Sequence, residues 1–313
     1  MRRLRWVFGA FALVSLVLAV RFAMYFPWAG TVNAIAGADW LLLAAASLAN
    51  IASLLAKGWA WHLVLLPSAP HRWRTAQAAT LVAAAVNSVS VSLSGEVARV
   101  QLVATRDGVP LRAGIWSLVW SRVIEAVSLM LFLAAVLAVI PTEPWMRPIE
   151  IGAWVVLGIL ALAWPLGAGP RLLRLLPARW QPPVQGGSAT LTLWRLAAPL
   201  ALSVVNWGAQ WLAFYWAFAA THVSTSAMVS LSALVMANLG GIIRITPGNV
   251  GVLQASLALG MLAFRIPGDQ ALAAGLALQA VQVIPVVAIG VALVGAQGLR
   301  SLGTKRAETV GTA

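Results

Sequence analysis

Residues 228–264, MVSLSALVMANLGGIIRITPGNVGVLQASLALGMLAF, form an apolar stretch that the segment TPGNVG at 246–251 breaks in its middle. A second apolar stretch, AQAATLVAAAVNSVSVSLSGEVARVQLVATRD at 76–107, is broken in the same way by SLSGE at 92–96. Glycine and proline end a helix and free backbone N–H and C=O groups, which lipid cannot satisfy. We therefore expect each stretch to form a helical hairpin that is buried in protein or lines a cavity. The residues that make the two breaks are Ser94, Gly95, Pro247, Gly248, Asn249 and Gly251.

The composition of the whole chain places it in a membrane. Of its 313 residues, 61% are hydrophobic and only 9% are charged, whereas a soluble domain carries roughly 25% charged residues. The formal net charge is +13, and arginines held on the cytoplasmic side of a membrane explain such an excess without a nucleic-acid partner. The chain has no cysteine, and we expect its three histidines, His62, His71 and His222, to lie far apart. The sequence therefore predicts no disulfide, no metal site and no cofactor.

Six further segments are apolar enough, and nearly all long enough, to span a bilayer, which takes about 20 residues. They are residues 6–26, 39–64, 112–140, 150–168, 195–220 and 270–298. The expected fold is an all-α polytopic membrane protein with about six transmembrane helices and two re-entrant, broken-helix hairpins. We interpret segment 6–26, which follows the basic residues MRRLR, as a retained signal anchor.

The basic residues predict the topology, because lysine and arginine stay on the cytoplasmic side. Arg72 precedes the first broken stretch and Arg112 follows it, so both ends of that stretch are expected in the cytoplasm. The second broken stretch lies between the uncharged residues 221–227 and Asp269, so both of its ends are expected outside. The N-terminus and the C-terminus are then cytoplasmic. If every apolar stretch crossed singly, or each broken stretch crossed twice, arginine clusters would fall on the wrong side.

The order of helix, broken hairpin and helix occurs twice, in opposite orientations. The first half covers about 39–140 and the second about 195–298, and the linker 169–194 joins them. We expect residues 299–313 to form a disordered tail. Inverted repeats in which broken helices meet near the midplane are typical of transporters. The alternative is that two glycine-centred turns match by chance.

Ionisable side chains at membrane depth are costly and need a partner or a purpose. Arg122 and Glu125 lie three residues apart on one expected helix, and Glu96 and Arg99 have the same spacing at the first break. The two pairs either neutralise themselves and hold helices together, or cross-pair as a four-charge cluster suited to a lipid headgroup. Lys57 lies near a helix end, where we expect its ammonium to snorkel to the interface.

Arg244 precedes the second break and has no acidic residue near it in the sequence. Beside an unwound backbone and a helix N-terminus, its guanidinium either binds a phosphate or reaches the outer interface. Amide side chains at membrane depth are suited to hydrogen bonds between helices. They are Asn87, Asn206, Asn238, Gln254, Gln279 and Gln282.

Three motifs of the chain match those of a known family. They are Ser94-Gly95-Glu96 with Arg99 and Asp107-Gly108-Val109, then Ser121-Arg122-Val123-Ile124-Glu125, and then Thr246-Pro247-Gly248-Asn249-Val250-Gly251-Val252-Leu253-Gln254. Together they resemble the transmembrane domain of lysylphosphatidylglycerol synthases and the stand-alone flippase-like proteins related to it. The second motif is similar to the family's Arg-x-x-Asp, and the third to its Pro-Gly-Gly-x-Gly-x-x-Glu.

The chain departs from the family pattern at three positions of the second half. Gln254 stands where the family has Glu, and Gln279 stands about where the family often has Arg. We interpret this double change as an ion pair that has become a neutral hydrogen-bonded pair. Arg244 stands where a proline is common in the family.

The resemblance implies a transporter that moves a phospholipid, or another polar-headed lipid, between leaflets. In the synthases a separate soluble domain makes the aminoacylated lipid, and we do not expect that activity here. The basic N-terminus and the absence of organelle signals favour a prokaryotic inner (plasma) membrane. The candidate headgroup or cavity residues are Glu96, Arg99, Arg122, Glu125, Arg244, Gln254 and Gln279.

Two other functions stay open at this point. The first is a non-transporting partner or scaffold in envelope-lipid biosynthesis, bound to a lipid-biosynthetic enzyme. The second, less favoured, is an intramembrane lipid-modifying enzyme, which needs a metal cluster or a nucleophile–base pair. The sequence offers neither, and we expect no enzymatic activity.

Overall fold

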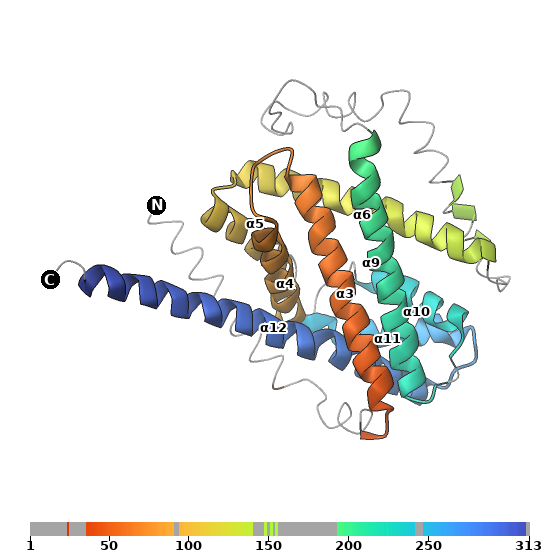
Figure 1. Cartoon of the computed structure of the whole chain (residues 1–313). Coiled ribbons are helices and arrows are strands. Elements are labelled where there is room, and N and C mark those ends of the chain that lie inside the picture. Colours follow the sequence, from red (N-terminus) through yellow and green to blue (C-terminus); the bar gives the residue numbers. More distant parts are fainter. Residues whose placement is uncertain are drawn as a thin grey trace.

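The computed structural model is all-helical over the residues that it describes, with eight α-helices and one short 3-10 helix (Figure 1). Those residues are 24, 36–90, 94–139, 147–148, 151–152, 154–155, 193–223, 225–241 and 247–310. The predicted helices 6–26 and 150–168 and the linker 169–194 lie almost entirely outside the described residues, and so does Arg244.

Four long helices lie where the sequence predicts them. Their ends differ from the predicted ends by at most two residues, except at the C-terminal end of the last helix. They are α3 (Trp40–Leu65), α6 (Leu111–Val139), α9 (Leu193–Ala220) and α12 (Gly268–Val310). Within the described residues, three segments are long and apolar enough to cross a membrane. These are Trp40–Leu65, Leu111–Ala138 and Gly268–Gly295.

Helix α12 is longer than the sequence predicts. It continues through residues 299–310, where we expect a disordered tail, and ends at Val310. Seven of its twelve residues are leucine, alanine, lysine, arginine or glutamate, which all favour the helical backbone. Their helix propensity explains why the polar composition of the segment does not end the helix.

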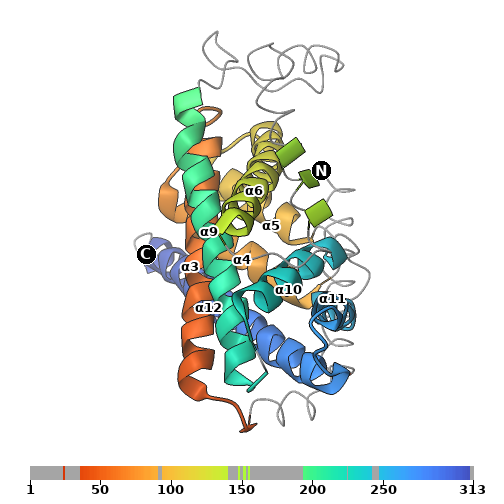
Figure 2. The same cartoon turned by 90° about the vertical axis from the view of Figure 1, so that its right-hand side faces the viewer.

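Helices α3 and α9 pack side by side in opposite directions (Figures 1 and 2). The start of α3 meets the end of α9, where the Asp39 N–H donates to the Ala220 carbonyl at 2.9 Å. The Asp39 carboxylate also accepts the N–H groups of Leu41 and Leu42, which caps α3. Helices α6 and α12 cross this pair obliquely and contact both of its members. The pair α3–α9 is therefore the centre around which the other helices are arranged.

Helices α4 (Trp73–Val89) and α5 (Ser94–Asp107) fold back on each other as the first hairpin. At its base, the Arg72 N–H and Nε donate to the Asp107 carboxylate at 2.9 and 3.1 Å. Burial raises the pKa of Asp107, but hydrogen bonds from Arg72 and Thr75 outweigh burial and lower this pKa overall. These bonds join the two ends of the hairpin.

Two residues that we expect at the first break lie in a helix instead. Ser94 and Gly95 form the first turn of α5 instead of an unwound segment. The Gly95 N–H donates to Asn87 Oδ1 at 3.0 Å, and the Ser94 hydroxyl bonds that of Ser90. A side chain on Gly95 would collide with the Ala83 carbonyl. Gly95 therefore permits the close approach of α4 and α5, a role that does not require it to break the helix.

Helices α10 (Ala227–Gly240) and α11 (Val252–Leu262) form the second hairpin, in which Ser232 Oγ donates to the Gly260 carbonyl at 2.8 Å. Between them lies the 3-10 helix η3 (Pro247–Asn249). The φ angles of Gly248, Asn249 and Gly251 are 60°, 58° and 83°, in the left-handed region that glycine and asparagine tolerate best. The predicted break at these residues is confirmed.

Large apolar side chains are exposed along the three helices that are suited to span a membrane. Examples are Leu48 and Leu55 on α3, Val119 and Val123 on α6, and Ile284 and Val291 on α12. In water such a surface would cause aggregation, whereas acyl chains cover it without cost. The exposed surface thus agrees with the composition: the described helices are built to lie in lipid.

Candidate functional site

Five charged side chains from α3, α5 and α6 meet inside the protein, and we call them the charge cluster: Lys57, Glu96, Arg99, Arg122 and Glu125. Arg122 donates to Glu125 at 2.9 Å and also pairs with Glu96. Arg99 Nη1 lies 3.8 Å from Glu96 Oε2. Both pairings that the sequence leaves open are present: the pairs within each motif, and the cross-pairing of the two motifs through Arg122 and Glu96.

Lys57 belongs to this cluster, so the prediction that it snorkels to the interface is wrong. Its Nζ lies 3.1 Å from both carboxylate oxygens of Glu125, and its side chain is 21% exposed. The two residues are 68 positions apart in the sequence. At membrane depth, an ion pair with a nearby carboxylate stabilises the Lys57 ammonium more than extension of the side chain toward the interface does.

Arg99 is the most deeply buried member of the charge cluster, with 2% of its surface exposed. Its guanidinium lies 3.9 Å from the ring centroid of Trp61, a cation–π contact. The Trp61 Nε1–H donates to Ser117 Oγ at 2.9 Å, which fixes the ring. Within the described residues, Arg99 Nε and Nη2 have no hydrogen-bond acceptor. Two donors of a buried cation are thus free for an acceptor from outside the protein.

The charge cluster has three basic and two acidic side chains, so it carries one excess positive charge. Four of its side chains are mostly buried, whereas the Arg122 side chain is 45% exposed. The cluster therefore opens to the surroundings at Arg122. A buried site with an excess cation and free N–H groups is suited to bind an anion.

In the second half, Gln254 and Gln279 form a neutral pair at the break. Gln254 Nε2 donates to Gln279 Oε1, and Gln279 Nε2 donates to the Gly248 carbonyl at 3.0 Å. Gln254 Oε1 accepts the N–H of Gly251 at 2.7 Å. Gln254 is 7% exposed and Gln279 is 1% exposed. Their side-chain amides hold the unwound backbone in place. The prediction of a neutral hydrogen-bonded pair is confirmed.

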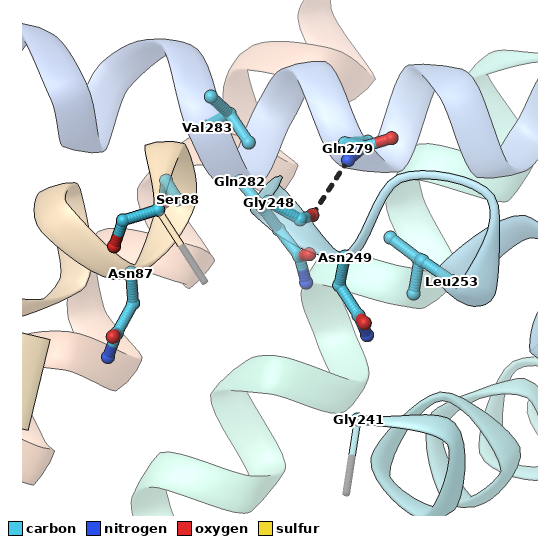
Figure 3. A pocket seen from close by; sticks show the side chains of 10 residues that line it. Asn87, Ser88, Gly241, Gly248, Asn249, Leu253, Gln279, Gln282 and Val283 are labelled. Carbon is cyan, nitrogen blue, oxygen red and sulfur yellow. Dashed lines mark hydrogen bonds between the residues drawn. The ribbon is translucent and has the colours of Figure 1, made fainter. Parts of the chain in front are cut away.

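The two breaks meet, since the Gly248 N–H donates to the Ser90 carbonyl at 3.4 Å. A cavity of about 220 Å³ lies at this meeting point, between the end of α4, the second break and α12 (Figure 3). Leu253 and Val283 supply apolar parts of its wall. The polar side chains that line it are Asn87, Ser88, Ser90, Asn249, Gln279 and Gln282.

Residues 7–290 match the family described as the lysylphosphatidylglycerol synthase TM region. The chain belongs to this family. The matched range contains the charge cluster, both hairpins and the cavity, so the family resemblance carried by three short motifs extends over almost the whole protein. No curated protein matches the chain.

Family membership and the apolar helices together establish a membrane protein of a lipid-related family. The family-like positions Glu96, Arg99, Arg122 and Glu125 lie together in the charge cluster, whereas Gln254 and Gln279 lie at the cavity. Arg244 lies outside the described residues. The binding of a headgroup by these seven residues stays a prediction.

Only some of the other predicted amide contacts join two helices. Asn87 bonds Gly95 across the first hairpin, as predicted. Asn238 instead bonds the Leu234 carbonyl of its own helix at 2.8 Å. Asn206 Oδ1 is buried and has no partner within the described residues.

The histidines do not all lie far apart, so that prediction is wrong for two of them. His62 Nδ1 lies 2.8 Å from His71 Nε2, and His71 Nδ1 lies 2.9 Å from the Ala69 carbonyl. The turn after α3 reverses the chain and brings the two rings together. Among the described residues, no group of three or more His, Cys, Asp or Glu side chains is placed to hold a metal ion.

Proposed function

We propose that this chain moves lipids between the leaflets of its membrane, as a flippase-like transporter of a phospholipid or other polar-headed lipid. The observation that carries the proposal is the Arg99 guanidinium, which is buried and has two donor nitrogens, Nε and Nη2, without an acceptor within the described residues. A lipid phosphate brings anionic oxygens that bind such donors strongly. The charge cluster around Arg99 has the excess positive charge that a phosphate would neutralise.

The proposed architecture has six transmembrane helices and two re-entrant hairpins in an inverted repeat, with the halves 39–140 and 195–298. Three features of the helices support it. Each half has a long helix, two short helices and a second long helix, and the first helices of the halves, α3 and α9, are antiparallel. The hairpin helices have 17, 14, 14 and 11 residues, fewer than the roughly 20 that span a bilayer. The breaks of the two hairpins meet at a polar cavity.

In this proposal both termini are cytoplasmic, as the distribution of arginine predicts. The membrane is a prokaryotic inner membrane, which the basic N-terminus and the absence of organelle signals favour. The partners are membrane lipids, and the chain is a transporter without enzymatic activity. The phosphate enters past the exposed side of Arg122 and reaches Arg99. Inside the protein, the Arg99 guanidinium and the phosphate then bind each other in place of the water that each has lost. This contact lowers the free-energy cost of moving the headgroup through the membrane.

Substitutions in the charge cluster are expected to slow lipid movement. We expect Arg99→Ala and Arg122→Ala, and also Glu96→Gln, to slow translocation by about tenfold or more, because each change removes at least one charge-assisted hydrogen bond from the site. The measurement uses the full chain in proteoliposomes with a fluorescent phospholipid. The rate at which dithionite-protected fluorophore becomes accessible reports movement between leaflets.

The matched control is Arg106→Ala on the same helix α5, because Arg106 is outside the charge cluster. This variant is expected to retain the wild-type rate. A wild-type rate no faster than that of protein-free vesicles would contradict transport and favour the scaffold function. Wild-type rates for all three cluster variants would contradict the site instead.

A further inference from the structure

We propose that Trp61 is a positioning residue of the anion site, because its ring holds the Arg99 guanidinium open toward a phosphate and away from Glu96. This inference rests on the proposed function and adds a residue that none of the three family-like motifs contains. Trp61 lies on α3, whereas Glu96 and Arg99 lie on α5. Trp61 carries no charge, so its part in the site follows from the side chains that it contacts.

Glu96 and Arg99 carry opposite charges but are not hydrogen-bonded to each other. Arg99 Nε and Nη2 have no acceptor within the described residues, Glu96 Oε2 has no donor there, and all three atoms are buried. Arg99 Nη1 lies 3.8 Å from Glu96 Oε2, whereas a guanidinium–carboxylate hydrogen bond measures about 2.7–2.9 Å. Buried polar groups with complementary neighbours normally bond them. Another contact must therefore hold the two side chains apart.

The ring of Trp61 makes that contact. Arg99 Cζ lies 3.9 Å from the ring centroid, and tryptophan is the aromatic side chain that binds cations best. Trp61 is fully buried, and its Nε1–H donates to Ser117 Oγ at 2.9 Å. Ser117 Oγ in turn donates to the Gly114 carbonyl of α6 at 2.7 Å. The ring is thus fixed between α3 and α6, and it fixes the guanidinium that α5 supplies.

The position of the ring decides which side of the guanidinium stays free. A cation–π contact uses a face of this planar group, whereas the N–H donors lie in its plane. Nε and Nη2 lie along one edge, the fork that can bind two oxygens of one phosphate side by side. These are the two nitrogens of Arg99 that have no acceptor within the described residues. Trp61 therefore compensates the buried cation and leaves the fork to the phosphate.

Without the ring, Arg99 is expected to turn toward Glu96. A direct hydrogen bond would give Glu96 Oε2 the donor that it lacks, and it would use a guanidinium N–H that the phosphate needs. The other oxygen of Glu96 already pairs with Arg122, so the carboxylate is held within reach of Arg99. Trp61 thus favours binding of the anion because it keeps a competing carboxylate at 3.8 Å.

Equilibrium binding of dihexanoylphosphatidic acid to the full chain, in an uncharged maltoside detergent, tests this inference. Trp61→Leu keeps an apolar side chain and removes the ring. We expect it to weaken binding about tenfold, the effect of losing a desolvated cation–π contact. Trp61→Phe keeps a ring face and is expected to stay within about threefold of the wild type. The matched control is Trp59→Leu, the same change at a residue of α3 that is 52% exposed, and it is expected to keep the wild-type affinity.

A double-mutant cycle separates positioning from packing. Arg99→Gln weakens binding by itself, and Trp61→Leu is expected to cause no further loss in that background, because the ring acts through the guanidinium. If Trp61→Leu does not fold, tetrafluorotryptophan at position 61 takes its place. This ring keeps nearly the shape of tryptophan but has little negative charge on its face, so it is expected to weaken binding about threefold or more.

Three results would overturn the inference: wild-type affinity of the Trp61→Leu or tetrafluorotryptophan variant, the same loss with and without Arg99, or no binding to the wild type. Binding is measured without movement. Binding that depends on Trp61 in a protein that translocates nothing would therefore overturn the proposed function alone. Translocation together with binding that does not depend on Trp61 would overturn this inference alone.

Discussion

Replacement of Glu125 by glutamine is expected to lower the free energy of unfolding by about 3 kcal/mol, since it leaves the ammonium of Lys57 buried without a counter-ion. Glu125 is 8% exposed and pairs with both Lys57 and Arg122. Arg122 keeps Glu96 as a partner, whereas Lys57 has no second carboxylate among its ion pairs in the described residues. The expected loss is at the low end for a broken buried pair, because the Lys57 side chain keeps 21% exposure. Denaturant titration in detergent, followed by tryptophan fluorescence, measures it.

A second substitution separates a lost ion pair from a general packing defect. Lys57→Met added to Glu125→Gln removes the uncompensated charge, so the double variant is expected to regain most of the lost stability. Asp269→Asn, at an exposed acid of α12, is the charge-matched control and is expected to change stability by less than about 1 kcal/mol. Wild-type stability of Glu125→Gln, or no recovery in the double variant, would show that the pair contributes nothing.

The neutral amide pair at the second break predicts an equally large effect with a characteristic rescue. Gln254→Glu places a carboxylate against Gln279, whose amide cannot then donate both to that carboxylate and to the Gly248 carbonyl in its present geometry. Gln279→Arg places an uncompensated guanidinium at a position that is 1% exposed. Each single variant is expected to lose about 3 kcal/mol of unfolding free energy.

The double variant, Gln254→Glu with Gln279→Arg, is expected to recover to within about 1 kcal/mol of the wild type, because it sets a carboxylate and a guanidinium against each other as an ion pair. A double-mutant cycle in the same denaturant titration gives the coupling energy. Gln101→Glu, the same change at an exposed position of α5, controls for the added carboxylate. If the losses of the two single variants simply add in the double variant, the two side chains do not act as a pair.

The long helices and the second break could be predicted because their signals are local. About 20 apolar residues in a row indicate a spanning helix, and a proline followed by a glycine, as in Pro247-Gly248, disfavours a continuous helix. The first break lacks a proline, so its position was predicted less well. Ser94 and Gly95 are compatible with the first turn of a helix, and α5 begins with them.

The charge cluster could be predicted only in part. The spacing of three residues within each of the pairs Glu96–Arg99 and Arg122–Glu125 is visible in the sequence, and it indicates a shared helical face. Lys57 joins the cluster from a helix 68 residues away from its partner, and no local pattern indicates such a contact. Lys57 was predicted to snorkel because it lies near a helix end.

The cavity could not be predicted, because three segments that are distant in the sequence build it. The sequence indicated Asn87 as a polar residue at membrane depth and Asn249 as a residue of the second break. Their placement on facing walls of the cavity depends on the packing of α4 against the second break. The close approach of His62 and His71 was missed for a related reason, since it depends on how the turn after α3 closes.

Transport through the meeting point of the two breaks requires that the hairpins enter the membrane from opposite sides. Single cysteines test this directly, because the chain has none of its own. Ser226→Cys and Gly268→Cys mark the two ends of the second hairpin, and a side chain at position 268 meets no atom within 4 Å. Ser68→Cys and Thr105→Cys mark the ends of the first. An impermeant thiol reagent is applied to intact and to permeabilised cells.

The predicted result is labelling of positions 226 and 268 in intact cells, and of positions 68 and 105 only after permeabilisation. That pattern places both ends of each hairpin on one side and the two hairpins on opposite sides. Labelling of only one position of either pair in intact cells would mean that the hairpin crosses the membrane, and labelling of all four would place both hairpins on the same side. Either of these results contradicts transport between two inverted hairpins.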